Sequence, residues 1–291
     1  MPNKALVTGA AGFVGQYLVR HLESEGWEVK KSRVDIRQYE DLRNKLDKYR
    51  PTHIFHLAAQ AYVPESFTSP QRVLEVNTIG SLNILEAIRQ LGFQTRILLV
   101  GTSEEYGSGD VEETSMLEPK SPYAISKLAM DYLGQLYAKS YGMHIVVSRA
   151  FNHTGPGRGE QYAESSWAKQ IVDIERGTNK KGHVEHGNLE SVRNYTDVRD
   201  MVKAYKLAID LPPDVYNICS NQNVTMKEVL STLFNKSKIE DVSKPNSSLF
   251  RPVDFSFKEP NCDKFKSLTD WKPEISLDQT LEDLLEYWRS Q

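Results

Sequence analysis

The sequence predicts an α/β protein with a Rossmann-type, doubly wound parallel sheet and a smaller C-terminal substrate-binding lobe. Two observations carry this prediction. Short apolar runs alternate with longer segments of helical periodicity through the first half of the chain, and a glycine-rich turn follows the first apolar run. Alternation of this kind is typical of parallel strands that are covered by helices.

The first half of the chain contains five runs that fit strands, namely Lys4–Thr8, Trp27–Ser32, His53–Ala59, Arg96–Gly101 and His144–Arg149. Between the first two runs, apolar residues recur at helical spacing from Phe13 to Leu22, and Gly26 fits a helix C-cap. Further helices are expected around Leu82–Ile88 and Leu128–Leu136. Strands and helices therefore alternate from residue 4 to about residue 150.

The second half of the chain has a different composition. The segment Asn152–Asn188 is rich in Gly, Asn, His and charged residues, with one clear helix around Trp167–Arg176, and the helix-and-strand rhythm returns after Asn194. We therefore expect an NAD(P)-binding domain over residues 1–165, to which residues 187–220 return. Residues 166–186 and 221–291 would form the substrate-binding lobe.

Composition limits the partners of the chain. The formal net charge is -3 over 291 residues with the two signs interspersed, so we expect no nucleic-acid partner. No apolar run reaches the ~20 residues that span a bilayer, and no signal peptide is evident, so we expect neither a membrane partner nor secretion. Cys219 and Cys262 lack metal-ligand or disulfide spacing, which predicts structural cysteines without a metal in a reducing cytoplasm.

A glycine-rich turn predicts dinucleotide binding. Gly9, Gly12 and Gly15 follow the first predicted strand and open the first predicted helix. Glycines in this context permit a tight turn and let backbone N–H groups approach a pyrophosphate. We expect Gly9, Gly12, Phe13 and Val14 to bind the cofactor; a turn without a ligand is the less favoured alternative.

The identity of the cofactor depends on where the second strand ends. If it ends near Ser32, its tip carries Ser32, Arg33 and two preceding lysines but no acid, which favours the 2′-phosphate of NADP. Asp35 stands at the distance expected of an acid that binds the ribose of NAD. We prefer NADP(H), because Asp35 and Ile36 suit an adenine contact better, and NAD(H) stays open.

One tyrosine stands in a catalytic context. Among fourteen tyrosines, only Tyr123 has a lysine four residues later, and a helix brings Tyr123 and Lys127 onto one face. Thr102 follows a predicted strand, where doubly wound enzymes place their chemistry. A nearby ammonium lowers the pKa of a tyrosine, so we expect Tyr123 to exchange a proton with a substrate oxygen. Lys127 would tune it and hold the nicotinamide ribose, and Thr102 would bind the reacting oxygen.

Several segments together resemble the extended short-chain dehydrogenase family over nearly the whole chain. They are T-G-A-A-G-F-V-G, H-L-A-A, V-N-T-I-G-S, G-T-S-E-E-Y-G, S-P-Y-A-I-S-K and F-N-H-T-G-P-G. Within that family, they most resemble the branch of the GDP-4-keto-6-deoxy-D-mannose reductases. Residues 187–189, 192–200 and 250–252 also resemble that branch. The resemblance implies that Thr102, Tyr123 and Lys127 form a catalytic triad. It also implies a set of cofactor contacts at Asp35, Ile36, Leu57, Ala58, Ala59 and Asn77.

One feature departs from the family. The connection from Val29 to Asp35 is shorter than the family usually has, which leaves the choice between NADP and NAD open.

A nucleoside diphosphate sugar needs fixed cations, and arginine suits its phosphates because the planar guanidinium contacts two oxygens at once. Arg193 and Arg251 are the candidates. The resemblance implies that Asn152 holds the diphosphate or the sugar, that Lys169 lies near the nucleotide and that Ser103 contacts the substrate. Surface ion pairs are the alternative for Arg251 and Lys169.

Together with these features, the resemblance implies an NADPH-dependent enzyme that reduces the C4 ketone of a GDP-4-keto-6-deoxy sugar to GDP-D-rhamnose or a heptose analogue, with Tyr123 as proton donor. A nucleotide-sugar 4,6-dehydratase or epimerase that recycles its nicotinamide is the alternative, because related dehydratases resemble the chain at Glu104. In a reductase, Glu104 would either orient the substrate or make only a local hydrogen bond. A nucleotide-sensing protein without activity is a third possibility, against which the triad argues.

The resemblance also implies a homodimer. Apolar residues in the helices that start near Asn77 and Tyr123 resemble the four-helix interface of the family. Packing of these residues against the sheet is the alternative.

Overall fold

The computed structural model describes residues 3–291 except 109–110, 221–222, 252, 255 and 257–258, so that Pro252 of the predicted 250–252 motif lies outside it. Its main body contains a six-stranded parallel sheet of order β2-β1-β3-β4-β5-β9. The strands are β1 (Lys4–Thr8), β2 (Glu28–Lys31), β3 (His53–His56), β4 (Arg96–Val100), β5 (His144–Ala150) and β9 (Val215–Ile218). The order in which the chain adds strands reverses between β1 and β3. This is the switch point where doubly wound sheets bind ligands. The predicted fold class and the five predicted strands are confirmed.

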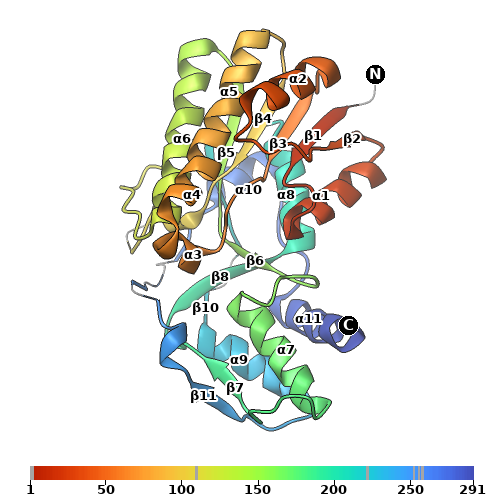
Figure 1. Cartoon of the computed structure of the whole chain (residues 1–291), viewed down its shortest axis with the longest axis vertical. Helices are drawn as coiled ribbons and strands as arrows, with labels where there is room; N and C mark the ends of the chain where they lie inside the picture. Colours follow the sequence, from red (N-terminus) through yellow and green to blue (C-terminus); the bar gives the residue numbers. More distant parts are fainter. Residues whose placement is uncertain (1–2, 109–110, 221–222, 252, 255, 257–258) are drawn as a thin grey trace.

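Helices cover both faces of this sheet (Figure 1). Successive strand residues point to opposite faces, so that Leu98 and Val146 join one apolar cluster while Leu99 and Val147 join the other. Both faces are therefore buried, as in other parallel sheets. One face packs against α1 (Phe13–Ser24), α8 (Val198–Ala208) and α10 (Asp263–Thr269), and the other against α2 (Tyr39–Tyr49), α5 (Gly80–Leu91) and α6 (Pro122–Tyr141).

Short elements connect β3 to α5 and β4 to α6. They are α3 (Val63–Thr68), α4 (Pro70–Leu74), the π-helical turn η1 (Glu75–Ile79) and the 3-10 turn η2 (Ser103–Glu105). The turn η1 runs directly into α5, and η2 begins at the carboxyl edge of the sheet.

A second, smaller body forms the lower lobe in Figure 1. Its three-stranded sheet has the order β10-β8-β6, and β11 pairs with β7. The strands are β6 (Asn152–Thr154), β7 (Val184–His186), β8 (Val192–Asp197), β10 (Asn223–Thr225) and β11 (Ser243–Pro245). The helices α7 (Ala163–Glu175), α9 (Met226–Asn235) and α11 (Leu277–Ser290) enclose an apolar core with these strands, and the short turn η3 (Ser247–Leu249) follows β11.

The pairing of strands and the packing of helices differ from the predicted domain boundaries, since β6 (residues 152–154) already pairs in the lobe. Residues 192–197 form β8, which pairs with β6 and β10 in the lobe, so only α8 and β9 of the segment 187–220 return to the main body. The helix α10 packs against β9 and α8 of the main body, although the sequence places it in the lobe. The partner of a strand depends on long-range pairing, such as Asn152 with Tyr195, which no local pattern displays.

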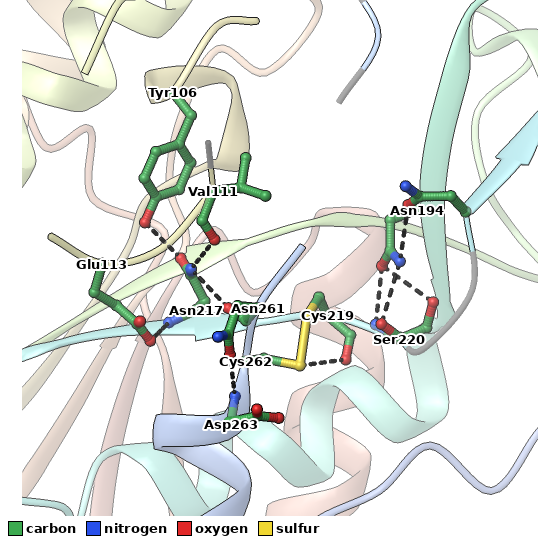
Figure 2. Close-up of a disulfide and its surroundings, with 11 residues drawn as sticks. Tyr106, Val111, Glu113, Asn194, Asn217, Cys219, Ser220, Asn261, Cys262 and Asp263 are labelled. Atoms are coloured by element: carbon green, nitrogen blue, oxygen red, sulfur yellow. Dashed lines mark hydrogen bonds between the residues drawn. A yellow bond between two sulfur atoms is a disulfide. The ribbon is translucent and has the colours of Figure 1, made fainter. Parts of the chain in front are cut away.

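The structure also corrects the prediction for the cysteines. Cys219, just after β9, and Cys262, the N-cap of α10, form a disulfide although 43 residues separate them (Figure 2). Beside it, the Asn217 amide donates hydrogen bonds to the carbonyl oxygens of Val111 and Asn261 at 2.9 Å each. The fold brings the cysteines together by placing α10 against β9, which spacing alone does not reveal.

The cytoplasmic location stays a prediction. The cysteines no longer support it, because disulfides are rare in the reducing cytosol. In the part of the chain that the structure describes, no helix combines the length and the apolar character needed to cross a membrane.

Candidate active site

A cleft of about 870 Å³ separates the carboxyl edge of the main sheet from the lobe. Clefts of this size at the switch point of an α/β sheet are typical ligand sites. Most of the predicted site residues line it, namely Gly9, Gly12, Phe13, Val14, Leu57, Ala59, Thr102, Ser103, Glu104, Tyr123, Lys127, Asn152, Arg193 and Arg251.

The glycine-rich turn leaves backbone donors facing this cleft. Gly9 has a φ of +67°, and a Cβ there would lie 2.8 Å from the backbone nitrogen of Ala58, so only glycine fits. Gly12 is the N-cap of α1, and because glycine has no side chain, no cap side chain binds the N–H groups of the first helical turn. The N–H groups at the start of α1 are therefore suited to bind the pyrophosphate of a dinucleotide.

Two predicted cofactor contacts support the cleft from behind. Ala58 packs against Gly9 and donates its N–H to the Thr8 hydroxyl at 3.2 Å. Asn77 is buried, and its amide accepts the N–H of Gln60 at 2.8 Å and donates to the Gln60 carbonyl at 3.0 Å and to Ser126 Oγ at 2.9 Å. The Asn77 side chain thus makes its hydrogen bonds to other groups of the protein. It supports the cleft by holding Gln60, which lines the cleft.

A second cavity of about 320 Å³ lies beside the glycine-rich turn, at the tip of β2. Ser32, Arg33, Lys31 and Arg20 line it. The Ser32 hydroxyl oxygen is buried and makes no hydrogen bond within the described residues. A buried hydroxyl without a partner beside three cations is suited to bind an anionic group.

The Asp35–Ile36 pair lines neither cavity. Asp35 forms an exposed bidentate pair with Arg37, at 2.6 Å between Oδ2 and Nη2. Ile36 is buried beneath Gly80 at the start of α5. The adenine contact stays a prediction; in this structure Ile36 packs into the apolar core, and neither residue lines the cleft or the second cavity.

Three buried side chains from two neighbouring elements form the catalytic candidate. Thr102 is the N-cap of η2, and its hydroxyl accepts the N–H of Glu104 at 3.3 Å. Tyr123 and Lys127 lie one turn apart near the start of α6, which Ser121 caps by accepting the N–H of Ala124 at 3.0 Å. The cap and the proline after it fix where α6 begins, and so which face of the helix meets the cleft.

The electrostatics of Tyr123 differ from the expectation of a lowered pKa. Burial and the charge of Glu104 raise the pKa of Tyr123 well above its usual range, and a hydrogen bond with Thr102 opposes them. Burial lowers the pKa of Lys127 to about 8, although Glu105 opposes this effect. At neutral pH the phenol keeps its proton, which is the form that donates one.

The lobe presents cations and amide groups to the other half of the cleft. Arg193, on β8, donates from Nη2 to Asp254 Oδ1 at 2.6 Å. Arg251 Nη1 lies 3.4 Å from Glu104 Oε1, so an ion pair crosses the cleft. Asn152 Oδ1 is buried and accepts no hydrogen bond in the ranges that the structure describes.

Lys169 is the predicted substrate residue that the structure does not bring to the cleft. Its ammonium lies 2.9 Å from Asp173 and 3.7 Å from Glu160. The face of α7 that lines the cleft carries Ser166 and Trp167. Lys169 comes two residues after Trp167 and therefore points to roughly the opposite side of the helix from it, and the sequence does not reveal which side meets the cleft.

Sequence reasoning missed Arg158, which lines the cleft just after β6. Its guanidinium carbon lies 3.4 Å from the ring centre of Tyr162 and 5.1 Å from that of Phe13. Its Nε is buried and makes no hydrogen bond to any described residue, and Glu164 Oε1 lies 3.8 Å away. A guanidinium held between two rings at the edge of the cleft is suited to bind phosphate. The glycines on either side of Arg158 were the available signal.

Comparison with known proteins decides the family. The model of the GDP-mannose 4,6 dehydratase family matches residues 30–284. The chain belongs to this family. As a member of it, the chain is an enzyme with the fold of the extended short-chain dehydrogenases, as the glycine-rich turn and the triad predict.

Relatives of this GDP-mannose 4,6 dehydratase family member include both reductases and dehydratases. The chain is 30% identical to GDP-6-deoxy-D-mannose reductase of Pseudomonas aeruginosa, over 100% of the chain and 99% of that protein. It is 28% identical to GDP-mannose 4,6 dehydratase 1 of Arabidopsis thaliana, over 97% of the chain and 88% of that protein.

Solved structures share the whole fold. RMD from Pseudomonas aeruginosa, complexed with NADPH, matches with a TM-score of 0.91 and 30% identity, covering 99% of each chain. The UDP-glucose 4-epimerase of Thermus thermophilus, in complex with NAD, matches with a TM-score of 0.88 and 29% identity, covering 98% of this chain and 99% of that one. Proteins with this fold thus include both an NADPH complex and an NAD complex.

Proposed function

We propose that this enzyme uses NADPH to reduce the C4 ketone of a GDP-4-keto-6-deoxy sugar, giving GDP-D-rhamnose or the corresponding heptose product. The observation that carries the proposal is a buried, protonated Tyr123 beside Thr102, in a cleft whose other half presents Arg193 and Arg251. Similarity to GDP-6-deoxy-D-mannose reductase over the full length of both proteins supports it.

The triad supplies the proton of the reduction. NADPH, when bound, supplies the hydride that C4 receives. The Thr102 hydroxyl binds the ketone oxygen, and Tyr123 donates its phenolic proton to that oxygen as negative charge develops there. The ketone gains a hydride and a proton and becomes an alcohol, and the Lys127 ammonium stabilises the phenolate left on Tyr123.

The lobe residues hold the nucleoside diphosphate. Arg193 and Arg251 offer planar N–H donors to the phosphate oxygens, and each now faces a carboxylate, Asp254 or Glu104 respectively. A bound diphosphate would compete with these carboxylates for the arginines. Asn152, with its buried Oδ1, is placed to accept a hydrogen bond from a sugar hydroxyl.

The cavity at the tip of β2 supports NADP over NAD. Ser32, Arg33, Lys31 and Arg20 would surround the 2′-phosphate, and the cavity lies against the glycine-rich turn that binds the pyrophosphate. Among these cations, Lys31 lies 3.2 Å from Glu23. This pair is exposed, so it is weak and leaves Lys31 able to turn toward a phosphate.

Replacing Arg33 with alanine is expected to raise the KM for NADPH by about 10- to 100-fold, because a charge-assisted hydrogen bond contributes about 1.5–3 kcal/mol. The KM for NADH should stay unchanged. Lys30→Ala is the matched control, since Lys30 is an exposed cation on β2, three residues before Arg33, that does not line the cavity. Equal losses with both cofactors for Arg33→Ala would contradict a 2′-phosphate site.

A 4,6-dehydratase is the second candidate, because Glu104 faces the cleft and the family model carries that name. In that reaction, Glu104 would remove a proton from the sugar after its oxidation. Glu104 pairs with Arg251 in the free enzyme, so it could act as a base only after the substrate diphosphate has taken this cation.

One experiment separates the candidates. Purified enzyme is mixed with GDP-4-keto-6-deoxymannose or with GDP-mannose while nicotinamide absorbance is followed. A reductase consumes one NADPH per 4-keto sugar, whereas a dehydratase converts GDP-mannose with no net change in absorbance. Cofactor binding with no conversion of either sugar would instead support a nucleotide sensor.

We infer a homodimer from an exposed apolar stripe on α6. Ile125, Tyr132 and Leu136 are 49%, 54% and 53% exposed and recur at helical spacing on one face. Leu74 and Ile79, on the neighbouring α4 and η1, are also exposed, and both elements pack against α6. A second copy related by a twofold axis would cover this stripe with its own α5 and α6, in line with the family resemblance.

Replacing Tyr132 and Leu136 together with aspartate is expected to convert a dimer into a monomer, because paired copies would bury four like charges at the interface. Light scattering coupled to size-exclusion chromatography measures the mass. Leu268→Asp is the control, since Leu268 is equally exposed at 53% but lies on α10. A wild-type chain that elutes as a monomer at micromolar concentration would refute the dimer.

A further inference from the structure

The side chain of Glu105 turns away from the cleft and into the interior behind the triad. It is fully buried, and its Oε1 accepts the N–H of Thr102 at 2.9 Å. With the Thr102 hydroxyl as cap, this bond forms a reciprocal capping box around η2. Glu105 therefore fixes the backbone of the residue whose hydroxyl faces the substrate.

The second carboxylate oxygen of Glu105 has a different environment. Oε2 makes no hydrogen bond within the described ranges, although Arg149 Nε lies 3.4 Å away. Arg149 directs its Nε to Asp131 Oδ2 at 2.8 Å, and its Nη1 donates to the Tyr106 hydroxyl at 3.0 Å. The guanidinium is thus committed mainly to Asp131, and the charge of Glu105 is only partly compensated by it.

The charges in this region balance only when Glu105 is counted with the triad. Glu105 and Asp131 supply two buried carboxylates, and Arg149 and Lys127 supply two buried cations. Lys127 donates a hydrogen bond to the Val100 carbonyl at 2.6 Å. A buried ammonium is stabilised by a nearby negative charge. Arg149 is shared between Asp131 and Glu105, and the Glu105 carboxylate comes near Lys127 because the two side chains bond to backbone groups only two residues apart, the Thr102 N–H and the Val100 carbonyl.

We propose that Glu105 is a positioning residue for proton transfer, which fixes the backbone of Thr102 and serves as the buried counter-charge that keeps Lys127 protonated beside Tyr123. The proposal rests on the proposed function of the triad. Two effects on Glu105 itself oppose its ionisation, since burial and the neighbouring Asp131 raise its pKa. The other ionisable groups around the pair are His56 on β3, Tyr123 on α6, and Glu104 and Tyr106 at η2.

Glu105→Gln removes the charge and keeps an acceptor for the Thr102 N–H. Both Lys127 and Tyr123 should then lose their protons more easily, because the negative charge that favours their protonated forms is gone. The alkaline fall in kcat/KM for ketone reduction should move to lower pH by about one pH unit. An unchanged profile would show that Glu105 is uncharged or irrelevant to Lys127 and would overturn the proposal.

Glu105→Asp keeps the charge with a shorter reach to Thr102. It should retain the wild-type pH profile with a lower kcat, and a shift equal to that of the glutamine variant would overturn the counter-charge role. Glu113→Gln is the matched control, because Glu113 Oε1 accepts the N–H of Asn217 close to the same cluster and glutamine preserves that bond. Its pH profile should match the wild type.

A binding measurement separates this proposal from the proposed function. If Lys127 holds the cofactor ribose, NADPH affinity should weaken at high pH, and the midpoint of this loss should fall by about one pH unit in Glu105→Gln. Cofactor fluorescence measures this without a sugar. A shifted midpoint would support the role of Glu105 even if the 4-keto sugar is not turned over, whereas turnover with unshifted midpoints would overturn that role alone.

Discussion

Replacing Tyr123 with phenylalanine is expected to lower kcat for ketone reduction by about 100- to 10,000-fold, the range that a positioned general acid contributes. The substitution removes the donor and keeps the ring, which packs against Val63 and Val73. Affinity for NADPH should therefore stay close to the wild-type value. Single-turnover reduction of the 4-keto sugar and fluorescence titration of NADPH measure the two quantities separately.

A second buried tyrosine provides the control for this substitution. Tyr205, on α8, also borders the cleft, and its hydroxyl makes no hydrogen bond within the described residues. Tyr205→Phe should keep most of the activity. Full turnover by Tyr123→Phe would refute the proposed mechanism, and equal losses in both variants would indicate a packing effect.

Features that depend on neighbouring residues could be predicted from the sequence. The alternation of Leu98 and Leu99 between the two faces of the sheet follows from strand geometry, and the run of apolar residues alone indicates β4. Gly9 could be assigned because its left-handed conformation and its closeness to Ala58 are demanded by any such turn. The positions of Tyr123 and Lys127 on one face of α6 likewise follow from a spacing of four.

Features that depend on long-range packing could not be predicted from the sequence. The bond between Cys219 and Cys262 requires α10 to lie against β9, and β8 joins the lobe only because β6 lies beside it. Lys169 fell outside the cleft because the phase of α7 is set by its packing against α9 and α11. Glu105 was passed over for the same reason, since its role depends on Arg149, which lies 44 residues further along the chain and is held by Asp131.

Replacing Arg193 with methionine is expected to lower kcat/KM for the GDP sugar by about 30-fold or more, because loss of one partner of a buried, hydrogen-bonded charge pair costs about 2–5 kcal/mol. The loss should appear mainly in KM and in the Kd for GDP, and NADPH binding should be unaffected. Methionine fills a similar volume, so the apolar surroundings on β8 should stay packed. Calorimetric titration with GDP and with NADPH measures the two affinities.

Asp254 determines how this result is interpreted. Burial raises the pKa of Asp254, but the charge of Arg193 and the hydrogen bonds from Arg193 and Asn188 together outweigh burial and hold that pKa below its usual range. The carboxylate therefore stays ionised and competes with the substrate diphosphate for the same guanidinium. Asp254→Asn should bind GDP at least as tightly as the wild type, because it removes that competition and a repulsive charge. Weaker binding of GDP by Asp254→Asn would mean that Asp254 orients Arg193 rather than competing for it, whereas unchanged binding by Arg193→Met would remove Arg193 from the diphosphate site.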